Sequence, residues 1–271
     1  MLRISLRRSL FPISQTLLLL VGMLACGTPT EAGEREALST PTIAIAVAAN
    51  MQFAMEELTK AFTKESGIKC QTSVSSSGKL TAQIQQGAPF DIFVSANMKY
   101  PNEIQNSGLA ALPPKVYANG RLVLWSMKKG LEPSLDLLSD PSIRHIALAN
   151  PKVAPYGMAA EQALKEHGLL PDIQGKLVFG ESIAQTNQFI TTQSAAIGFT
   201  AMSVVLSPAL QGKGQWIPLP SDLYTAIEQG VVVIKRQDKE ISAARSFYDF
   251  LSSATAKGIL QNFGYEVKEN S

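Results

Sequence analysis

The most constraining feature of this sequence is a repeated alternation between short apolar runs and segments with helical periodicity. The run TIAIAVAAN at 42–50 is apolar at nearly every position before it ends in Asn50, which is typical of a strand buried on both faces. The segment 51–65 then places Ala54, Leu58 and Phe62 on one helical face. A strand buried on both faces needs helices on both sides of its sheet. The start of the chain therefore predicts a layered α/β fold.

The same alternation continues to the end of the chain. Further strands are expected at 68–74, 90–96, 121–127, 143–149, 176–180, 196–201 and 230–235. Further helices are expected at 80–87, 100–106, 157–167, 182–193, 243–253 and 256–263. Strands that alternate with helices of this length are typical of α/β proteins with mostly parallel sheets. We therefore expect this class for residues 42–267.

The first 26 residues have the order of a secretory signal. They carry three arginines and no acidic side chain, then a short apolar stretch, then small residues that end at Cys26. The apolar stretch is short for a helix that spans a bilayer. We expect residues 1–26 to be a signal peptide and 27–41 a flexible tether. The end of the signal also resembles a lipoprotein cleavage site, at which Cys26 would be acylated; cleavage without lipid is the alternative.

Composition argues against several functional classes. The 24 Lys and Arg side chains nearly balance the 22 Asp and Glu side chains, so no basic field exists to attract nucleic acid. His145 and His167 are isolated from carboxylate and thiol clusters, which argues against a zinc site. The stretch GESIA has Ala184 where a nucleophile elbow needs glycine. We expect no enzyme and no cofactor; an exported enzyme on the same fold is the remote alternative.

The hydroxyl-rich turn SSSGK at 75–79 follows one predicted strand and leads into a helix. It is no nucleotide-binding P-loop, because position 73 is serine and position 80 is leucine. A helix start nevertheless presents free N–H groups and favours an anion. Similar junctions occur at 49–50, 154–157 and 180–184.

Several helix starts together would bind a small dianion without a formal counter-charge. A pocket of donors would reject an anion that keeps a proton, such as hydrogen phosphate. At the first of these junctions, Asn50 is also a candidate N-cap for the helix that follows.

Five stretches together resemble the periplasmic molybdate-binding proteins of ABC importers. They are VAANMQFAMEELTKAF, SSSGKLTAQIQQGAPFDIFVSA, GRLVLWS, HIALANPKVAPYGMAAEQAL and GFTAMS. The resemblance covers 42–267, and its most specific part is the pattern L-x-x-Q-I-x-x-G-A-P-x-D-I-F.

This resemblance implies a two-lobed periplasmic-binding-protein fold of type II, with mixed, mostly parallel sheets flanked by helices. Lobe I would comprise 42–122 plus 229–271, and lobe II 123–228. Two hinge crossovers would lie near 122–126 and 226–233.

The implied function is an extracytoplasmic solute-binding protein that captures molybdate or tungstate between the lobes with neutral hydrogen-bond donors. It would deliver the anion to the membrane subunits of an ABC importer. It would work as a monomer in the periplasm or at the outer face of the cytoplasmic membrane, without nucleic acid. Sulfate or another tetrahedral oxyanion is the alternative ligand.

The resemblance also implies binding residues. Ser77 would give its hydroxyl and N–H groups, and Asn50 its side-chain amide. Ala49 could give only its backbone. Tyr156 and Ile183 match positions whose backbone N–H groups donate to the anion.

One departure from the family affects the donor count. Many members carry a tyrosine hydroxyl near the GFTAMS strand, and the aligned residue here is Ala201. We therefore expect one donor fewer.

Overall fold

The computed structural model describes residues 40–267. The expected signal peptide, Cys26 and nearly all of the expected tether lie outside the described residues. Within 40–267, no helix is both long enough and apolar enough to cross a membrane.

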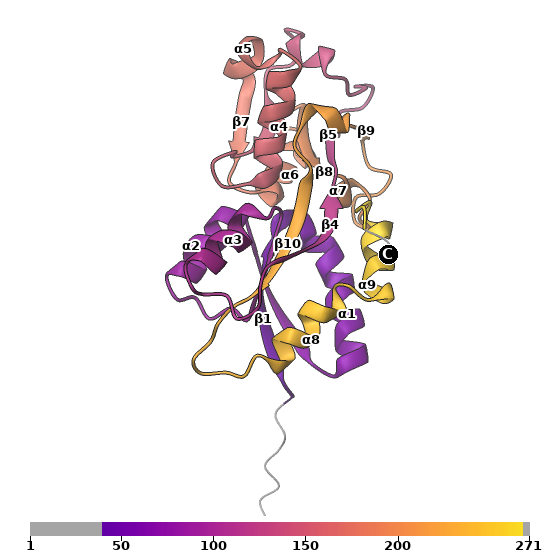
Figure 1. The fold of residues 1–271 in the computed structure, drawn as a ribbon. Helices are drawn as coiled ribbons and strands as arrows, with labels where there is room; N and C mark the ends of the chain where they lie inside the picture. The colour runs from indigo at the N-terminus through magenta and orange to yellow at the C-terminus, as the bar shows by residue number, and fades with distance from the viewer. Residues whose placement is uncertain (1–39, 268–271) are drawn as a thin grey trace, which may run out of the picture. The chain divides into compact units, whose positions relative to one another are not determined.

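The first of two sheets has the strand order β2-β1-β3-β10-β4 (Figure 1). Its strands are β1 (Thr42–Ala48), β2 (Lys69–Ser75), β3 (Ile92–Ser95), β4 (Lys115–Gly120) and β10 (Ile227–Val233). β1 is parallel to β2 and β3, whereas β10 is antiparallel to β3 and β4. The sheet is therefore mixed, with β1 at the centre of its parallel part.

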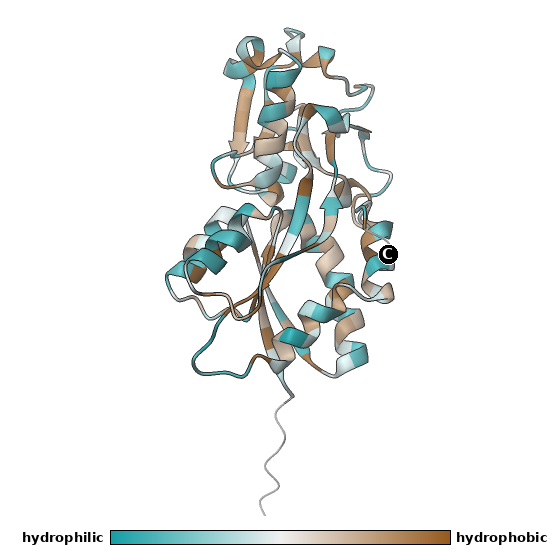
Figure 2. Cartoon of the chain, in the orientation of Figure 1, coloured by the Kyte–Doolittle hydropathy of each residue, from teal (hydrophilic) through white to brown (hydrophobic). Residues whose placement is uncertain are grey.

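Helices cover both faces of this sheet, as the apolar run of β1 predicts. They are α1 (Gln52–Ser66), α8 (Ser242–Phe250) and α9 (Ala254–Asn262) on one face, and α2 (Ser77–Gln85) and α3 (Lys99–Asn106) on the other. Ile43 and Ile45 pack toward the first group, and Ala46 packs against Leu80 of α2. Figure 2 shows apolar residues along the central strands and hydrophilic residues on α2 and α3.

The second sheet has the order β7-β6-β8-β5-β9. Its strands are β5 (Leu122–Ser126), β6 (Ile146–Ala149), β7 (Leu177–Gly180), β8 (Ile197–Ala201) and β9 (Gln215–Pro218). β6 is parallel to β7 and β8, and β5 is antiparallel to β8 and β9. The accompanying helices are α4 (Pro155–Glu166), α5 (Leu170–Ile173), α6 (Ile183–Thr191) and α7 (Met202–Val205). Short 3₁₀ turns are η1 (Ala49–Met51), η2 (Asp136–Ser139), η3 (Gln174–Lys176) and η4 (Ser221–Leu223).

The chain crosses between the sheets twice. It leaves the first sheet after Gly120 and enters the second at Leu122, and it returns between Pro218 and Ile227. Two mixed sheets, each flanked by helices and joined by two crossovers, confirm the predicted two-lobed α/β class. Below, the first lobe means the sheet that contains β1 with its helices, and the second lobe means the sheet that contains β6 with its helices.

Several local predictions were wrong. Strands β4 and β9 were not expected: β4 ends in Asn-Gly, which reads as a turn, and β9 ends in a proline. Asn50 is not the N-cap of α1, because the turn η1 comes first and Met51 takes that position without a side-chain cap bond. The side chain of Asn50 is engaged elsewhere, as described below.

Candidate functional site

A small cavity lies where strand-to-helix junctions from both lobes meet. From the first lobe come the ends of β1 and β2 and the residue after β3; from the second lobe come the starts of α4 and α6. The lining residues are Ala48, Ala49, Asn50, Ser76, Ser77, Ala96, Ala154, Pro155, Tyr156 and Ile183. All five residues that the sequence suggested for anion binding are in this set.

These junctions meet because the carboxyl ends of neighbouring parallel strands lie at the same edge of a sheet. β1, β2 and β3 all end at the cavity edge of the first sheet, and β6 and β7 lead into α4 and α6 of the second lobe. Three helices, α2, α4 and α6, therefore begin at the cavity. The positive ends of their dipoles lie at the same place.

Ser77 is the first residue of α2 and is almost fully buried. Its Oγ accepts a hydrogen bond from the N–H of Ala96 at 3.0 Å. Since the oxygen acts there as an acceptor, the hydroxyl proton of Ser77 is left to donate to another group. The Ser77 N–H lies in the first turn of α2, where N–H groups have no partner within the helix.

The start of α2 also touches the second lobe directly. The N–H of Gly78 donates to the carbonyl of Val153 at 2.9 Å. A Cβ at position 78 would lie 2.9 Å from the Tyr100 hydroxyl and 3.0 Å from the Val153 Cα, so glycine permits this approach.

Asn50 is buried, and its side chain points into a polar network within the protein. Its Nδ2 donates to Gln229 Oε1 at 2.8 Å and to the Tyr265 hydroxyl at 2.9 Å. Gln229 Nε2 donates to the carbonyls of Ile227 and Ala96, so the Gln229 Oε1 must accept from Asn50. Both N–H groups of the Asn50 amide are therefore used, and none is left for a ligand. The Asn50 side-chain amide was expected to donate to the anion, but in this arrangement it has no free N–H group to do so.

The backbone carbonyl of Asn50 belongs to the same network. Ser203 Oγ, at the start of the second lobe's α7, donates to the Asn50 carbonyl at 2.8 Å, and the Tyr265 hydroxyl lies 3.1 Å from Ser203 Oγ. Burial raises the pKa of Tyr265 far above its usual value, so its phenol stays neutral. The network therefore joins the lobes without formal charge.

Tyr156 is the second residue of α4, and its side chain extends away from its own backbone toward the first crossover. It is buried, and its hydroxyl lies near Asn50 and Tyr265 but makes no well-formed hydrogen bond within residues 40–267. A Cβ at Gly120, the last residue of β4, would overlap this hydroxyl. Burial raises the pKa of Tyr156 well above its usual value, and the nearby Tyr265 raises it further. This phenol, too, is neutral at physiological pH.

Ile183 is the first residue of α6, and the helix start is well formed around it. Ser182 is the N-cap, and its Oγ accepts from the N–H of Gln185 at 3.4 Å. The Ile183 N–H is thus positioned at the cavity by a capped helix. Ala201, in contrast, ends β8 in the core of the second lobe and does not line the cavity.

No side chain with a formal charge is in the cavity lining. Two charged side chains that follow or precede lining residues in the sequence, Lys79 on α2 and Glu181 just before α6, form an ion pair between the lobes. Residues 40–267 contain no group of three or more His, Cys, Asp or Glu side chains that would hold a metal ion. The site therefore offers neutral donors and helix dipoles.

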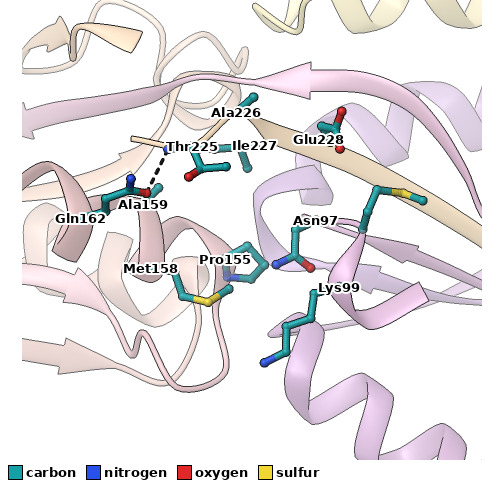
Figure 3. A pocket seen from close by; sticks show the side chains of 11 residues that line it. Asn97, Lys99, Pro155, Met158, Ala159, Gln162, Thr225, Ala226, Ile227 and Glu228 are labelled. Carbon is teal, nitrogen blue, oxygen red and sulfur yellow. Dashed lines mark hydrogen bonds between the residues drawn. The ribbon is translucent and has the colours of Figure 1, made fainter. Parts of the chain in front are cut away.

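A larger hollow of about 370 Å³ adjoins this cavity and shares Pro155 with it. Figure 3 shows Pro155 and Met158 of α4 on one side of the hollow and Lys99 of α3 on the other. Its wall includes Ala226 and Ile227, where the chain returns to the first sheet. Solvent therefore reaches the second crossover next to the cavity.

Comparisons with known proteins agree with this architecture. Residues 43–266 match the family model described as bacterial extracellular solute-binding protein. The chain is 35% identical to the molybdate-binding protein ModA of Azotobacter vinelandii over 249 residues, which cover 91% of this chain and 94% of that protein. It is 36% identical to ModA of Rhodobacter capsulatus over 244 residues, which cover 90% of this chain and 92% of that protein.

A solved structure is also similar. The Azotobacter vinelandii periplasmic molybdate-binding protein matches with a TM-score of 0.78 and 33% identity, over 84% of this chain and 100% of that one. The match therefore extends over both sheets and the junctions that form the cavity.

Proposed function

The chain belongs to the family of bacterial extracellular solute-binding proteins, and we propose that it binds molybdate or tungstate in the cavity between its lobes. In this proposal the protein is the solute-binding component of an ABC importer and does not catalyse a reaction. Its relatives of 35% and 36% identity are molybdate-binding proteins, which supports this ligand.

The observation that carries the proposal is the convergence of helix starts on an uncharged cavity. α2 comes from one lobe, and α4 and α6 come from the other. Each helix start is equivalent to roughly half a positive charge. A small dianion at this place would be stabilised from both lobes at once, which would favour the closed arrangement of the lobes.

The proposed donors are backbone N–H groups of Ala49, Asn50, Tyr156 and Ile183, together with the N–H and hydroxyl groups of Ser77. A hydrogen bond to a charged group contributes about 1.5–3 kcal/mol. Six such bonds suffice for binding at about 1 µM or tighter, which corresponds to about −8.2 kcal/mol after the costs of ordering and desolvation.

The same donors provide selectivity. An anion that keeps a proton at neutral pH would place a donor against donors, which leaves buried groups unpaired. Hydrogen phosphate should therefore bind poorly. Sulfate carries no such proton, so cavity size must separate it from molybdate.

Delivery requires the lobes to open and close. We propose lobe boundaries at 42–122 with 229–271 and at 123–228, with hinges at the two crossovers near 122–126 and 226–233.

The protein would act outside the cytoplasmic membrane as a monomer, and an acyl group on Cys26 would anchor it there. Mass spectrometry of membrane-extracted protein tests the anchor, since a mature form without a lipid on Cys26 contradicts it.

The function is tested by calorimetric titration of the purified protein with molybdate, tungstate, sulfate and hydrogen phosphate at equal ionic strength. We expect tight binding of molybdate and tungstate and no heat from hydrogen phosphate. Ser77→Ala should weaken molybdate binding about tenfold to a hundredfold, because one donor to a charged acceptor is lost.

Ser246→Ala is the matched control, since Ser246 is exposed on α8 and does not line the cavity. Its affinity should equal that of the unmodified protein. If neither molybdate nor tungstate binds, the proposed ligand is rejected. If only sulfate binds, the ligand of the protein is sulfate.

A further inference from the structure

Ser76 occupies a position where serine normally caps a helix, yet it caps nothing. It is the N-cap of α2, with φ −71° and ψ 149°, and its side chain makes no capping hydrogen bond. The residue is only 3% exposed, and its Oγ has no hydrogen-bond partner within the described structure. A buried hydroxyl without a partner is rare in native proteins and requires an explanation.

The other serine N-caps of the described helices behave differently. Ser253 Oγ accepts from the N–H of Ala256 at 3.1 Å at the start of α9, and Ser182 caps α6. At α2, one of the two N–H groups that an N-cap normally binds is already used, because Gly78 donates to the Val153 carbonyl of the other lobe. The contact between the lobes therefore competes with the cap.

Ser76 also lines the cavity, next to Ser77. Two observations thus coincide at one place: the first turn of a nine-residue helix and a buried, unpartnered hydroxyl in the wall of the same cavity. We propose that Ser76 is a further anion-binding residue, whose hydroxyl donates to an oxygen of the bound tetrahedral oxyanion. This inference rests on the proposed function of the cavity.

The chemistry suits this role. A serine hydroxyl has one proton to donate and two lone pairs to accept with. An anion oxygen in the cavity would accept the Ser76 proton and so supply the partner that the protein itself does not. Ser76 would then add a donor beside the hydroxyl of Ser77.

The test compares Ser76→Ala with Ser253→Ala. Each variant is titrated calorimetrically with molybdate, tungstate and sulfate, and the ligand-free protein is unfolded in urea. Ser76→Ala should weaken oxyanion binding about tenfold to a hundredfold and leave the urea midpoint unchanged, because no cap bond is lost. Ser253→Ala should do the reverse, since it removes a cap remote from the cavity.

Ser76→Gly serves as a second variant, because glycine is accepted at an N-cap and also lacks the hydroxyl. Its affinity should fall as in Ser76→Ala. Unchanged affinity in both variants, while the unmodified protein binds, would overturn the role of Ser76 alone. A lower urea midpoint for Ser76→Ala with unchanged affinity would identify an ordinary cap. Silence of the unmodified protein toward all three anions would overturn this inference together with the proposed function.

Discussion

Tyr156 connects two functions within one residue. Its backbone lies at the cavity, at the start of α4, and its buried hydroxyl lies against Gly120 at the first crossover. The absence of a side chain at position 120 is what admits this hydroxyl. The backbone N–H that we propose as a donor to the anion is therefore coupled, through one residue, to a contact at the crossover.

Gly120→Ala tests this connection. The added methyl group would overlap the Tyr156 hydroxyl, so the lobes should close less favourably, and the dissociation constant for molybdate should rise at least tenfold in calorimetric titration. The double variant with Tyr156→Phe should recover part of the affinity, because it removes the overlapping oxygen and keeps the backbone N–H.

Gly258→Ala is the matched control, since a Cβ there meets no atom within 4 Å. Its affinity should be unchanged. If the double variant binds no better than Gly120→Ala alone, the hydroxyl is not the cause.

Asn50 shows what a sequence can and cannot predict about a residue. Its place at a strand-to-helix junction predicted that it would line the site, and it does line the cavity. Its side-chain partners, Gln229 and Tyr265, lie 179 and 215 positions away along the chain. A local pattern contains no information about contacts at that separation, so the engagement of the amide could not be foreseen.

At the scale of elements, Asp91 joins strands at the end of the first sheet opposite the cavity. It is 3% exposed and precedes β3. Its Oδ2 accepts from the N–H of Ala44 on β1 and from Lys239 Nζ, both at 2.7 Å. The carboxylate thus ties β1 to the segment that follows β10.

Asp91→Asn should lower the free energy of unfolding by about 1.5–3 kcal/mol, because it removes the carboxylate charge that Lys239 and Arg236 partner at a partly buried place. The measurement is urea unfolding of the ligand-free protein. Molybdate affinity should not change, since Asp91 does not line the cavity. Asp172→Asn, at an exposed aspartate of α5, is the control and should shift stability by a few tenths of a kcal/mol. A variant at position 91 as stable as this control would contradict the role of Asp91.

Element types were predictable where the hydrophobic pattern was strong. The strand expected at 42–50 is present as β1 but ends two residues earlier, at Ala48, and the amphipathic α1 lies within one residue of its expected bounds. β9 was missed because it is a four-residue edge strand that ends in a proline. Its pairing with β5 depends on tertiary context, which overrides weak local preference.

At the scale of the whole molecule, the ion pair of Lys79 and Glu181 bridges the lobes at the rim of the site. Both side chains are more than a third exposed, so its contribution is small and screened by salt. The pair exists only while the lobes are together. It should therefore act on ligand affinity rather than on the stability of either sheet.

Glu181→Gln should raise the dissociation constant for molybdate by up to about fivefold at low ionic strength, and the difference should vanish near 1 M salt. Calorimetric titrations across a salt series measure this effect. Glu57→Gln, which breaks a pair with Lys60 inside α1, should leave the affinity unchanged. A loss at position 181 that persists at high salt would show that its charge is not the cause.

The arrangement of the two lobes followed from resemblance more than from periodicity. Alternation alone indicated an α/β chain, but strand order depends on contacts between distant segments, as when β10 inserts between β3 and β4. Ser77 could be predicted as a site residue because it lies at the junction between a predicted strand and a predicted helix. The sequence could not predict that the Ser76 hydroxyl lacks a partner within residues 40–267, because the contact of Gly78 with Val153 joins segments that are distant along the chain.

The uncharged lining of the cavity has an electrical consequence. The buried phenols near it stay protonated at neutral pH, so a captured dianion is neither neutralised by a side chain nor accompanied by a proton. The loaded protein would carry the full extra negative charge of its cargo and move faster toward the anode in a native gel. The loaded and empty forms that reach an importer would therefore differ in net charge as well as in shape.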